Sequence, residues 1–509
     1  MSTILSLLTA CGVPQTVDGA APEHLTSPWS QARSAHHPIT SAPVVPLIET
    51  KIMASDAAEF ERFGGSVSGA GDVNGDGYDD VIVGTSSHHT RYGSAYVYYG
   101  SSTGISAASE DKLVASDGEP GDLFGFTVAG AGDVNGDGTD DVIVSAYGYP
   151  DDRIGSAYVY YGSSTGISAA SEDKLVASDG EQFDLFGSSV AGAGDVNGDG
   201  YDDVIVAAYF ASAYVYYGSS TGISLASESR FIDLGVSYTC NWVASAGDVN
   251  GDGYDDVIIE TREAIYEGSD TYDVTTVYVY YGSSTGVTPD SRDTLTTPER
   301  VAVSGAGDVN GDGYDDVLIR SSDGASVHYG AITGISLTPE NTLNVPDLSS
   351  GTGAGDLNGD GYGELIIGVV DYSDNGIGST YIFYGTSTGV SHAVFDQFRA
   401  SDQMPGDRFG VGAGAGDIDG DGYDDVIVGA TGEDTHGDGS GAVYAFFTGR
   451  VEEDSGDPDG DTGTGESDNS SDDGAPEDST GCGCATSRVA PVGWLILLVG
   501  AGAAHRRRR

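Results

Sequence analysis

The sequence predicts an all-β protein: a seven-bladed β-propeller of four-stranded blades, closed by its N-terminal strand, with a disordered tail at each end. Two observations predict this fold. Nearly the same nine residues, first Asp72-Val-Asn-Gly-Asp-Gly-Tyr-Asp-Asp80, occur seven times, starting at Asp72, Asp133, Asp195, Asp248, Asp308, Asp356 and Asp417. A repeat of about 50 to 60 residues is typical of arrays built from one supersecondary unit. Each unit also contains four β-type segments and no segment with helical periodicity.

The second unit illustrates the predicted strands in order. Residues 124–132 are small and apolar, which suits a tightly packed inner strand, and the motif at Asp133 follows them. The β-branched run 142–144 predicts a buried second strand, and the alternating aromatic run 156–161 predicts a third. The more polar run 174–177 predicts the outer edge strand.

The two ends of the array predict how the ring closes. Residues 51–56 match the fourth-strand segment 112–117, whereas the array stops after residues 442–447, which match a third strand. The array therefore has one extra strand at its start and lacks one strand at its end. We expect residues 51–56 to complete the last blade, which removes the exposed sheet edges at that junction.

Composition divides the chain into four parts. Residues 1–46 are an export signal and disordered lead, 47–449 the propeller, 450–480 an acidic disordered linker, and 481–509 a C-terminal signal. The linker is too polar and too charged to bury a core. With 79 acidic and 20 basic residues, the chain has a net charge of −59. This charge makes nucleic acid and anionic membrane surfaces poor partners.

Both termini resemble addressing signals. Leu8-Thr-Ala-Cys11 resembles a bacterial lipobox, in which a signal peptidase cuts before a Cys that becomes lipidated. No Lys or Arg precedes it, so two interpretations stay open: the true start lies upstream, or the match is accidental. Cys482 and Cys484, the apolar run 489–504 and the Arg cluster 506–509 resemble the C-terminal sorting signal of myxobacterial surface proteins, with an ordinary tail anchor as the alternative. These signals imply export to the cell surface or outer membrane, with membrane contact only through the terminal anchors.

The nine-residue motif has the composition of a loop that wraps around a hard cation. Side-chain oxygens stand at positions 1, 3, 5 and 9, position 7 offers its backbone carbonyl, and Gly at position 6 permits a sharp turn. The predicted ligands are Asp72, Asn74, Asp76, Tyr78 and Asp80; Asp133, Asn135, Asp137, Thr139 and Asp141; Asp195, Asn197, Asp199, Tyr201 and Asp203; Asp248, Asn250, Asp252, Tyr254 and Asp256; Asp308, Asn310, Asp312, Tyr314 and Asp316; Asp356, Asn358, Asp360, Tyr362 and Glu364; and Asp417, Asp419, Asp421, Tyr423 and Asp425. We therefore expect up to seven structural Ca²⁺ ions.

Three alternatives to structural Ca²⁺ loops exist for this motif. An EF-hand requires a bidentate Glu at position 12, but position 12 is apolar in every copy, as in Val83 and Val144. Mg²⁺ is less suitable because it demands tighter octahedral geometry and retains its waters. Acidic turns without any metal remain the alternative.

With these loops, the repeat units resemble the FG-GAP family, the propeller of integrin α-subunit heads. The Phe-Gly pair occurs at Phe63-Gly64, Phe124-Gly125, Phe186-Gly187 and Phe409-Gly410, whereas units four to six lack it. The resemblance covers residues 47–449. It implies a calcium-binding adhesion or ligand-binding module rather than an enzyme.

Loop diversity predicts where a ligand binds. Strands alternate in direction, so loops 1–2 and 3–4 share one face and loops 2–3 and 4–1 share the other. The first face is repetitive, whereas the second is diverse, at residues 86–91, 147–153, 260–275 and 432–439. Diversity on one face of a rigid scaffold favours recognition there, with neutral drift as the alternative. We expect an extracellular protein or glycan ligand on this face of a monomeric propeller.

No catalytic residue is assigned, because the sequence contains no zinc motif, nucleophile elbow or phosphate-binding loop. The favoured function is an exported, surface-anchored, calcium-binding module for adhesion or ligand binding. The alternatives are a lectin-like carbohydrate-binding protein, a structural envelope protein and, with less support, a propeller that accompanies an enzyme.

Overall fold

The structure, a computed structural model, describes most of the repeat array. The described residues are 48–85, 93–148, 154–210, 212–225, 228–231, 238–267, 270–321, 324–345, 348–370, 376–391 and 395–449. The predicted lipobox at Cys11, the linker 450–480 and the sorting signal at Cys482 and Cys484 lie outside them. Among the described residues, no helix is long and apolar enough to cross a membrane.

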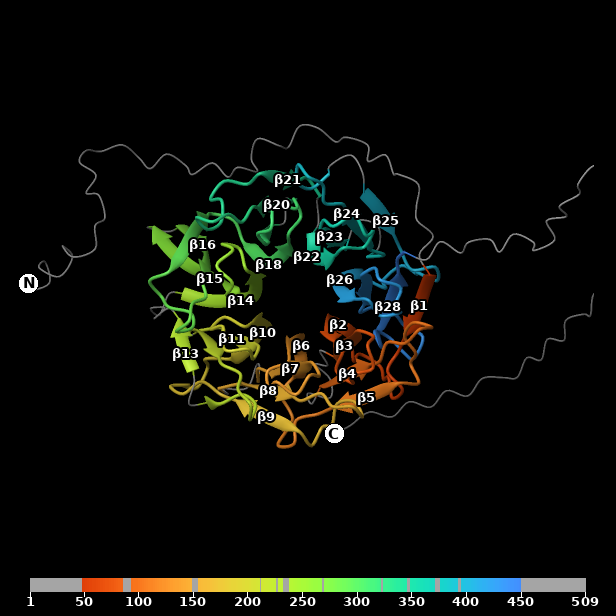
Figure 1. Ribbon diagram of the computed structural model, residues 1–509. Helices are drawn as coiled ribbons and strands as arrows, with labels where there is room; N and C mark the ends of the chain where they lie inside the picture. The colour runs from red at the N-terminus through yellow and green to blue at the C-terminus, as the bar shows by residue number, and fades with distance from the viewer. Residues whose placement is uncertain are drawn as a thin grey trace, which may run out of the picture. The chain divides into compact units, whose positions relative to one another are not determined.

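Seven four-stranded antiparallel sheets surround a common centre (Figure 1). Blade 1 contains β2 (Phe63–Gly71), β3 (Asp80–Thr85), β4 (Ser94–Tyr98) and β5 (Glu110–Leu113), and blade 2 contains β6 (Phe124–Gly132), β7 (Asp141–Ala146), β8 (Ser156–Tyr160) and β9 (Glu172–Leu175). Blade 3 contains β10 (Phe186–Gly194), β11 (Asp203–Ala208), β12 (Ala213–Tyr216) and β13 (Glu228–Phe231), and blade 4 contains β14 (Tyr238–Gly247), β15 (Asp256–Glu267), β16 (Asp270–Tyr280) and β17 (Arg292–Thr297). Blade 5 contains β18 (Val301–Gly307), β19 (Asp316–Ser321), β20 (Gly324–His328) and β21 (Asn341–Leu343), and blade 6 contains β22 (Leu348–Gly355), β23 (Glu364–Val369), β24 (Ser379–Phe383) and β25 (Phe395–Phe398). Blade 7 contains β26 (Phe409–Gly416), β27 (Asp425–Ala430), β28 (Ala442–Phe447) and the N-terminal β1 (Ile48–Ile52). The predicted seven-bladed propeller is confirmed.

The innermost strands end in small residues because these ends crowd around the centre. Each contacts the inner strand of the next blade, and β26 contacts β2. A Cβ atom added to Gly130 would lie 2.8 Å from the carbonyl oxygen of Gly69 in the neighbouring blade. Any larger residue at this position would push the two blades apart.

The hydrophobic core lies between neighbouring blades. The second strands β3, β7, β11 and β27 are buried along their whole length, which explains their β-branched runs. Beside them, the ring of Phe186 lies 5.5 Å from that of Tyr214 and 6.2 Å from that of Tyr216, measured between centroids. These aromatic contacts give the Phe-Gly pair its structural role.

We expect Phe186→Ala to lower the free energy of unfolding by about 3–5 kcal/mol, because it removes a fully buried ring. Phe183→Ala is the matched control, since the Phe183 side chain is 53% exposed. That change should cost about 0.5 kcal/mol or less. Denaturant unfolding of both variants checks this, and equal losses would contradict the interblade core.

The predicted ring closure is confirmed, with shifted strand bounds. β1 pairs antiparallel with β28, from Ile48 opposite Phe447 to Ile52 opposite Val443. The strand was expected over residues 51–56, but it ends at Ile52. The reason is that Ser55 donates its backbone N–H to Glu110 of blade 1, at 2.9 Å, and so belongs to the link between blades.

The same shift occurs in blade 2, where the predicted fourth strand 174–177 is observed as Glu172–Leu175. Ser178 then donates its backbone N–H to Glu228 of blade 3, at 3.2 Å. A recurring Ser–Glu contact therefore ends the outer strand and ties it to the next blade.

Candidate metal centre

The seven motifs form the loops between the first and second strands of the blades. The turn between strands 3 and 4 lies beside them, since Ser163 donates its N–H to the carbonyl of Val73 in the preceding blade, at 3.0 Å. Ser219 and Val134 make the same contact one blade further on. Loops 1–2 and 3–4 therefore share one face, as predicted.

The carboxylate at position 1 organises each loop. The two oxygens of Asp72 accept the backbone N–H groups of Asp76, at 3.0 Å, and Gly77, at 2.8 Å. Asp76 in turn accepts the N–H of Tyr78, at 3.2 Å. An ionised carboxylate has about four lone-pair positions, so these contacts leave oxygen capacity for a cation.

The carboxylate at position 9 is the most deeply placed group of the loop. Asp80 is fully buried, and its two oxygens accept the N–H groups of Val73, at 3.0 Å, and Gly100, at 2.8 Å. Burial, together with the charges of Asp76 and Asp72, raises the pKa of Asp80 to about 8. The pKa is likewise raised to about 8, with burial as the largest cause, for Asp141, Asp203, Asp256, Asp316, Glu364 and Asp425.

A cation beside such a carboxylate would offset both its burial and the repulsion from positions 1 and 5. The donors are all oxygens, from carboxylates, amides and one carbonyl, and hard dications such as Ca²⁺ prefer oxygen ligands. The residues present therefore fit the predicted ion.

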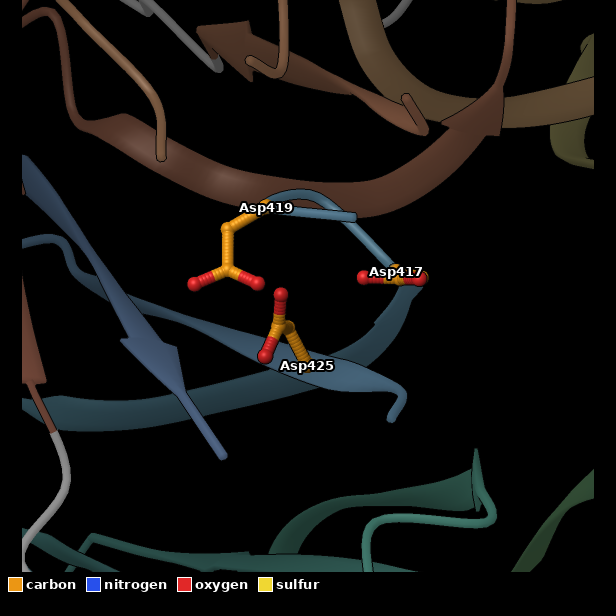
Figure 2. Close-up of side chains that lie close together, drawn as sticks. All are labelled: Asp417, Asp419 and Asp425. Carbon is orange, nitrogen blue, oxygen red and sulfur yellow. The ribbon is translucent and has the colours of Figure 1, made fainter. Parts of the chain in front are cut away.

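The seventh loop brings three carboxylates closest together. Side chains of Asp417, Asp419 and Asp425 point toward one another, and one oxygen from each lies within 4.8 Å of the others (Figure 2). Within the described ranges this is the one group of three or more His, Cys, Asp or Glu side chains that meets so closely. In the other six loops, position 3 is Asn, which offers oxygen without charge.

The sixth loop departs from the pattern. Its position 9 is Glu364, and the amide nitrogen of Asn358 donates to that carboxylate at 3.2 Å. The amide oxygen of Asn358 accepts the N–H of Asp360, at 2.9 Å. This loop is closed by its own hydrogen bonds, which hold the Asn358 amide between Glu364 and Asp360.

The side chain at position 7 also packs on the loop of the preceding blade. A Cβ atom added to Gly198, at position 4 of the third loop, would lie 2.5 Å from Cε1 of Tyr254. Gly198 has a φ of +70°, and the Tyr254 ring of blade 4 packs directly on it. This contact was not predicted, although Tyr at position 7 and Gly at position 4 recur together in the sequence. In the second loop, Thr139 takes the place of Tyr and lies near Gly75.

Position 8, for which no role was predicted, bridges adjacent loops. Its carboxylate accepts the backbone N–H of position 1 in the preceding blade: Asp140 from Asp72, Asp202 from Asp133, Asp255 from Asp195 and Asp315 from Asp248, each at 2.9 Å, Asp424 from Asp356 at 2.7 Å, and Asp79 from Asp417 at 2.8 Å. Burial, followed by neighbouring acidic charges, raises the pKa of all six of these carboxyls.

The opposite face carries a hollow, and the innermost strand β14 carries an exposed aromatic side chain. The hollow measures about 520 Å³, and its described lining includes Asp117, Asp122 and Lys174. On β14, the Trp242 side chain is 39% exposed, and the Arg320 guanidinium carbon lies 5.6 Å from its ring centroid. Of the diverse segments predicted for this face, 86–91 and most of 147–153 lie outside the described residues.

Blade 4 also buries a carboxyl within strand β15. Glu260 is fully buried, accepts a hydrogen bond from the Asn241 amide at 2.8 Å, and lies 3.5 Å from a guanidinium nitrogen of Arg262. Burial raises the pKa of Glu260 to about 7, although Arg262 opposes that shift. The folded chain therefore retains this proton at pH values where the unfolded chain has lost it.

We expect Glu260→Gln to remove one pH-dependent contribution to the free energy of unfolding. The pKa rises from 4.5 to about 7 on folding, so the free energy of unfolding should fall as pH increases through that window. The difference between wild type and variant should change by about 3 kcal/mol between pH 4 and pH 8. Denaturant unfolding across this range measures it, and parallel curves for the two proteins would contradict a perturbed Glu260.

Comparison with protein families matches the repeats. An FG-GAP-like repeat matches residues 72–144, 195–259 and 308–367, and an FG-GAP repeat matches residues 241–280 and 409–446. The matched segments include the loops that start at Asp72, Asp133, Asp195, Asp248, Asp308, Asp356 and Asp417.

Integrin α subunits are among the similar proteins. Integrin alpha-4 of Xenopus laevis is 33% identical over 156 residues, which cover 30% of this chain and 15% of the relative. Integrin alpha-7 of Homo sapiens is 33% identical over 172 residues, which cover 33% and 14%. Integrin alpha pat-2 of Caenorhabditis briggsae is 29% identical over 221 residues, which cover 38% and 17%. The aligned part is thus a small fraction of each relative.

Among solved structures, that of BBS1N in complex with ARL6DN aligns with a TM-score of 0.43 and 11% identity, covering 80% of this chain and 98% of that chain. The family assignment depends on the repeat matches and the observed blades. The chain belongs to the FG-GAP repeat family, as a seven-bladed β-propeller with similarity to integrin α subunits.

Proposed function

We propose that this chain is an exported, surface-anchored, calcium-binding propeller that serves as an adhesion or ligand-binding module. The observation that carries the proposal is the row of metal loops on one face, each with a fully buried carboxylate at position 9. Calcium would supply the positive charge that these loops lack.

The chain's own residues would hold the ion in a repeated arrangement. Side-chain oxygens of positions 1, 3, 5 and 9 and the carbonyl of position 7 provide the donors. Hydrogen bonds from positions 5 and 6 to the carboxylate of position 1 orient the loop in advance. The role is structural, because the ion would neutralise crowded carboxylates between two strands of one blade.

Calorimetric titration of the full chain with CaCl₂ tests the metal proposal. We expect several Ca²⁺ ions per chain, and we expect Asp417→Ala to remove one of them. The seventh loop is the best target because it combines three converging carboxylates. A wild-type chain that binds no Ca²⁺ would overturn the proposal.

The opposite face is the proposed ligand surface, and a glycan is a specific candidate there. The hollow at Asp117 offers polar groups on that face, and Trp242 on the innermost strand β14 offers an exposed aromatic surface, the two features that sugars use. Hydrogen bonds from Lys174 and Tyr158 lower the pKa of Asp117, so this carboxyl suits binding better than proton donation.

Binding of the labelled full chain to arrays of glycans and of surface proteins, in CaCl₂, tests the ligand surface. For any ligand found, Trp242→Ala should weaken binding about tenfold or more. Ile332→Ala is the matched control, because Ile332 is 79% exposed in a 3–4 turn on the metal-loop face. If Ile332→Ala weakened binding and Trp242→Ala did not, the ligand would lie on the metal-loop face, and the proposed ligand surface would be wrong.

A further inference from the structure

The position-8 carboxylates link the metal loops into a chain of direct contacts. Asp140 of blade 2 accepts the N–H of Asp72, at 2.9 Å, and donates its own N–H to the carbonyl of Asp72, at 3.1 Å. Asp72 is position 1 of the first loop, whereas Asp140 stands between positions 7 and 9 of the second. This reciprocal pair, which we call a clasp, therefore joins ligand-bearing residues of two adjacent loops.

The clasp requires space that glycine provides. Gly71, just before Asp72, has a φ of +71°, and a Cβ atom there would collide with the Asp140 carboxylate. The equivalent glycines Gly132, Gly194, Gly247, Gly355 and Gly416 face the carboxylates of Asp202, Asp255, Asp315, Asp424 and Asp79 in the same way. The glycine before each of these loops is thus matched to the carboxylate of the next blade.

One junction lacks the carboxylate. Position 8 of blade 6 is Gly363, which donates its N–H to the carbonyl of Asp308 at 2.9 Å but has no side chain to accept in return. A Cβ atom added to Gly307, just before Asp308, would find nothing within 4 Å. The empty space at Gly307 shows what the carboxylate fills at the other six junctions.

We infer that the position-8 residues are positioning residues that couple neighbouring metal loops, so that Ca²⁺ binding is cooperative around the ring except between blades 5 and 6. This inference rests on the proposed function. An ion in one loop fixes its positions 7 and 9 and thereby the carboxylate between them. That carboxylate holds position 1 of the preceding loop in place, which prepares the loop for its own ion.

Titration of the full chain with CaCl₂, followed by calorimetry, tests this coupling in three variants. Asp140→Ala removes one clasp, whereas Asp140→Asn retains an acceptor oxygen at the same place. Gly363→Asp should complete the seventh clasp, because its Cβ atom would lie no closer than 3.4 Å to any neighbour and the space at Gly307 is open.

We expect wild type to bind Ca²⁺ with a Hill coefficient above 1. Asp140→Ala should lower that coefficient and weaken binding at one or two sites by about fivefold or more, while Asp140→Asn should stay near wild type. Gly363→Asp should raise the coefficient, and it keeps the inference testable if Asp140→Ala fails to fold. Unchanged cooperativity in both Asp140→Ala and Gly363→Asp, with normal stoichiometry, would overturn the coupling and leave calcium binding intact. A wild type that binds no Ca²⁺ would instead overturn the proposed function itself.

Discussion

Removal of calcium is expected to lower the unfolding temperature of the purified full chain by at least about 10 °C. Each site filled at 100 times its dissociation constant contributes about 2.7 kcal/mol to the folded state. Several such contributions add in a single ring, and each kilocalorie shifts the unfolding temperature by about a degree or more. Without the ions, the carboxylates at positions 1 and 5 would repel one another, and the buried position 9, whose pKa is raised to about 8, would either lack a counter-charge or take up a proton.

Scanning calorimetry with CaCl₂ and with a chelator measures this effect. Added CaCl₂ should restore the higher unfolding temperature, which separates metal loss from damage by the chelator. MgCl₂ should restore less of it, because Mg²⁺ demands tighter octahedral geometry. Identical unfolding temperatures under all conditions would reduce the seven loops to acidic turns.

Disruption of β1 is also expected to have a large effect, because this strand closes the ring. Ile52 is fully buried beside residues of blades 7 and 1, including Phe63 and Val443. Ile52→Ala should therefore cost about 2–5 kcal/mol of unfolding free energy. Ile48→Ala is the matched control in the same strand, since Ile48 is 40% exposed, and its cost should be about 0.5 kcal/mol or less.

Deletion of residues 48–52 should go further and expose the backbone of β28 as a free sheet edge. Unpaired N–H and carbonyl groups on such an edge can pair with another chain. Light scattering is expected to show self-association of this variant at concentrations where the intact chain is monomeric. A monomeric, fully stable deletion variant would contradict closure by β1.

The sequence was sufficient to predict the architecture because its repeats identify both the turns within each blade and the number of blades. The motif at Asp72 marks the turn between two strands, and its recurrence counts the blades. The match between residues 51–56 and 112–117 correctly predicted closure. Its boundary was wrong because Ser55 serves the neighbouring blade, through Glu110, and such a contact leaves no trace in local strand patterning.

The residues of each candidate metal loop could be predicted from the sequence, but the contacts between neighbouring loops could not. Positions 1, 5 and 9 lie within single loops, where spacing alone identifies them. Asp140 and Tyr254 act on the preceding blade instead, so their roles depend on how blades pack. The substitution of Gly363 for Asp was visible in the sequence, yet its meaning requires the open space at Gly307.

The pairing of β1 with β28 also sets the order in which the ring can form during synthesis. Ile52 and its partner Val443 lie near opposite ends of the array, so the last blade cannot be completed until almost all of the array has left the ribosome. Blades 1 to 6 consist of consecutive strands and can form one after another. We expect closure of this long loop to be the last step of folding, and until that step the growing chain carries two open ends.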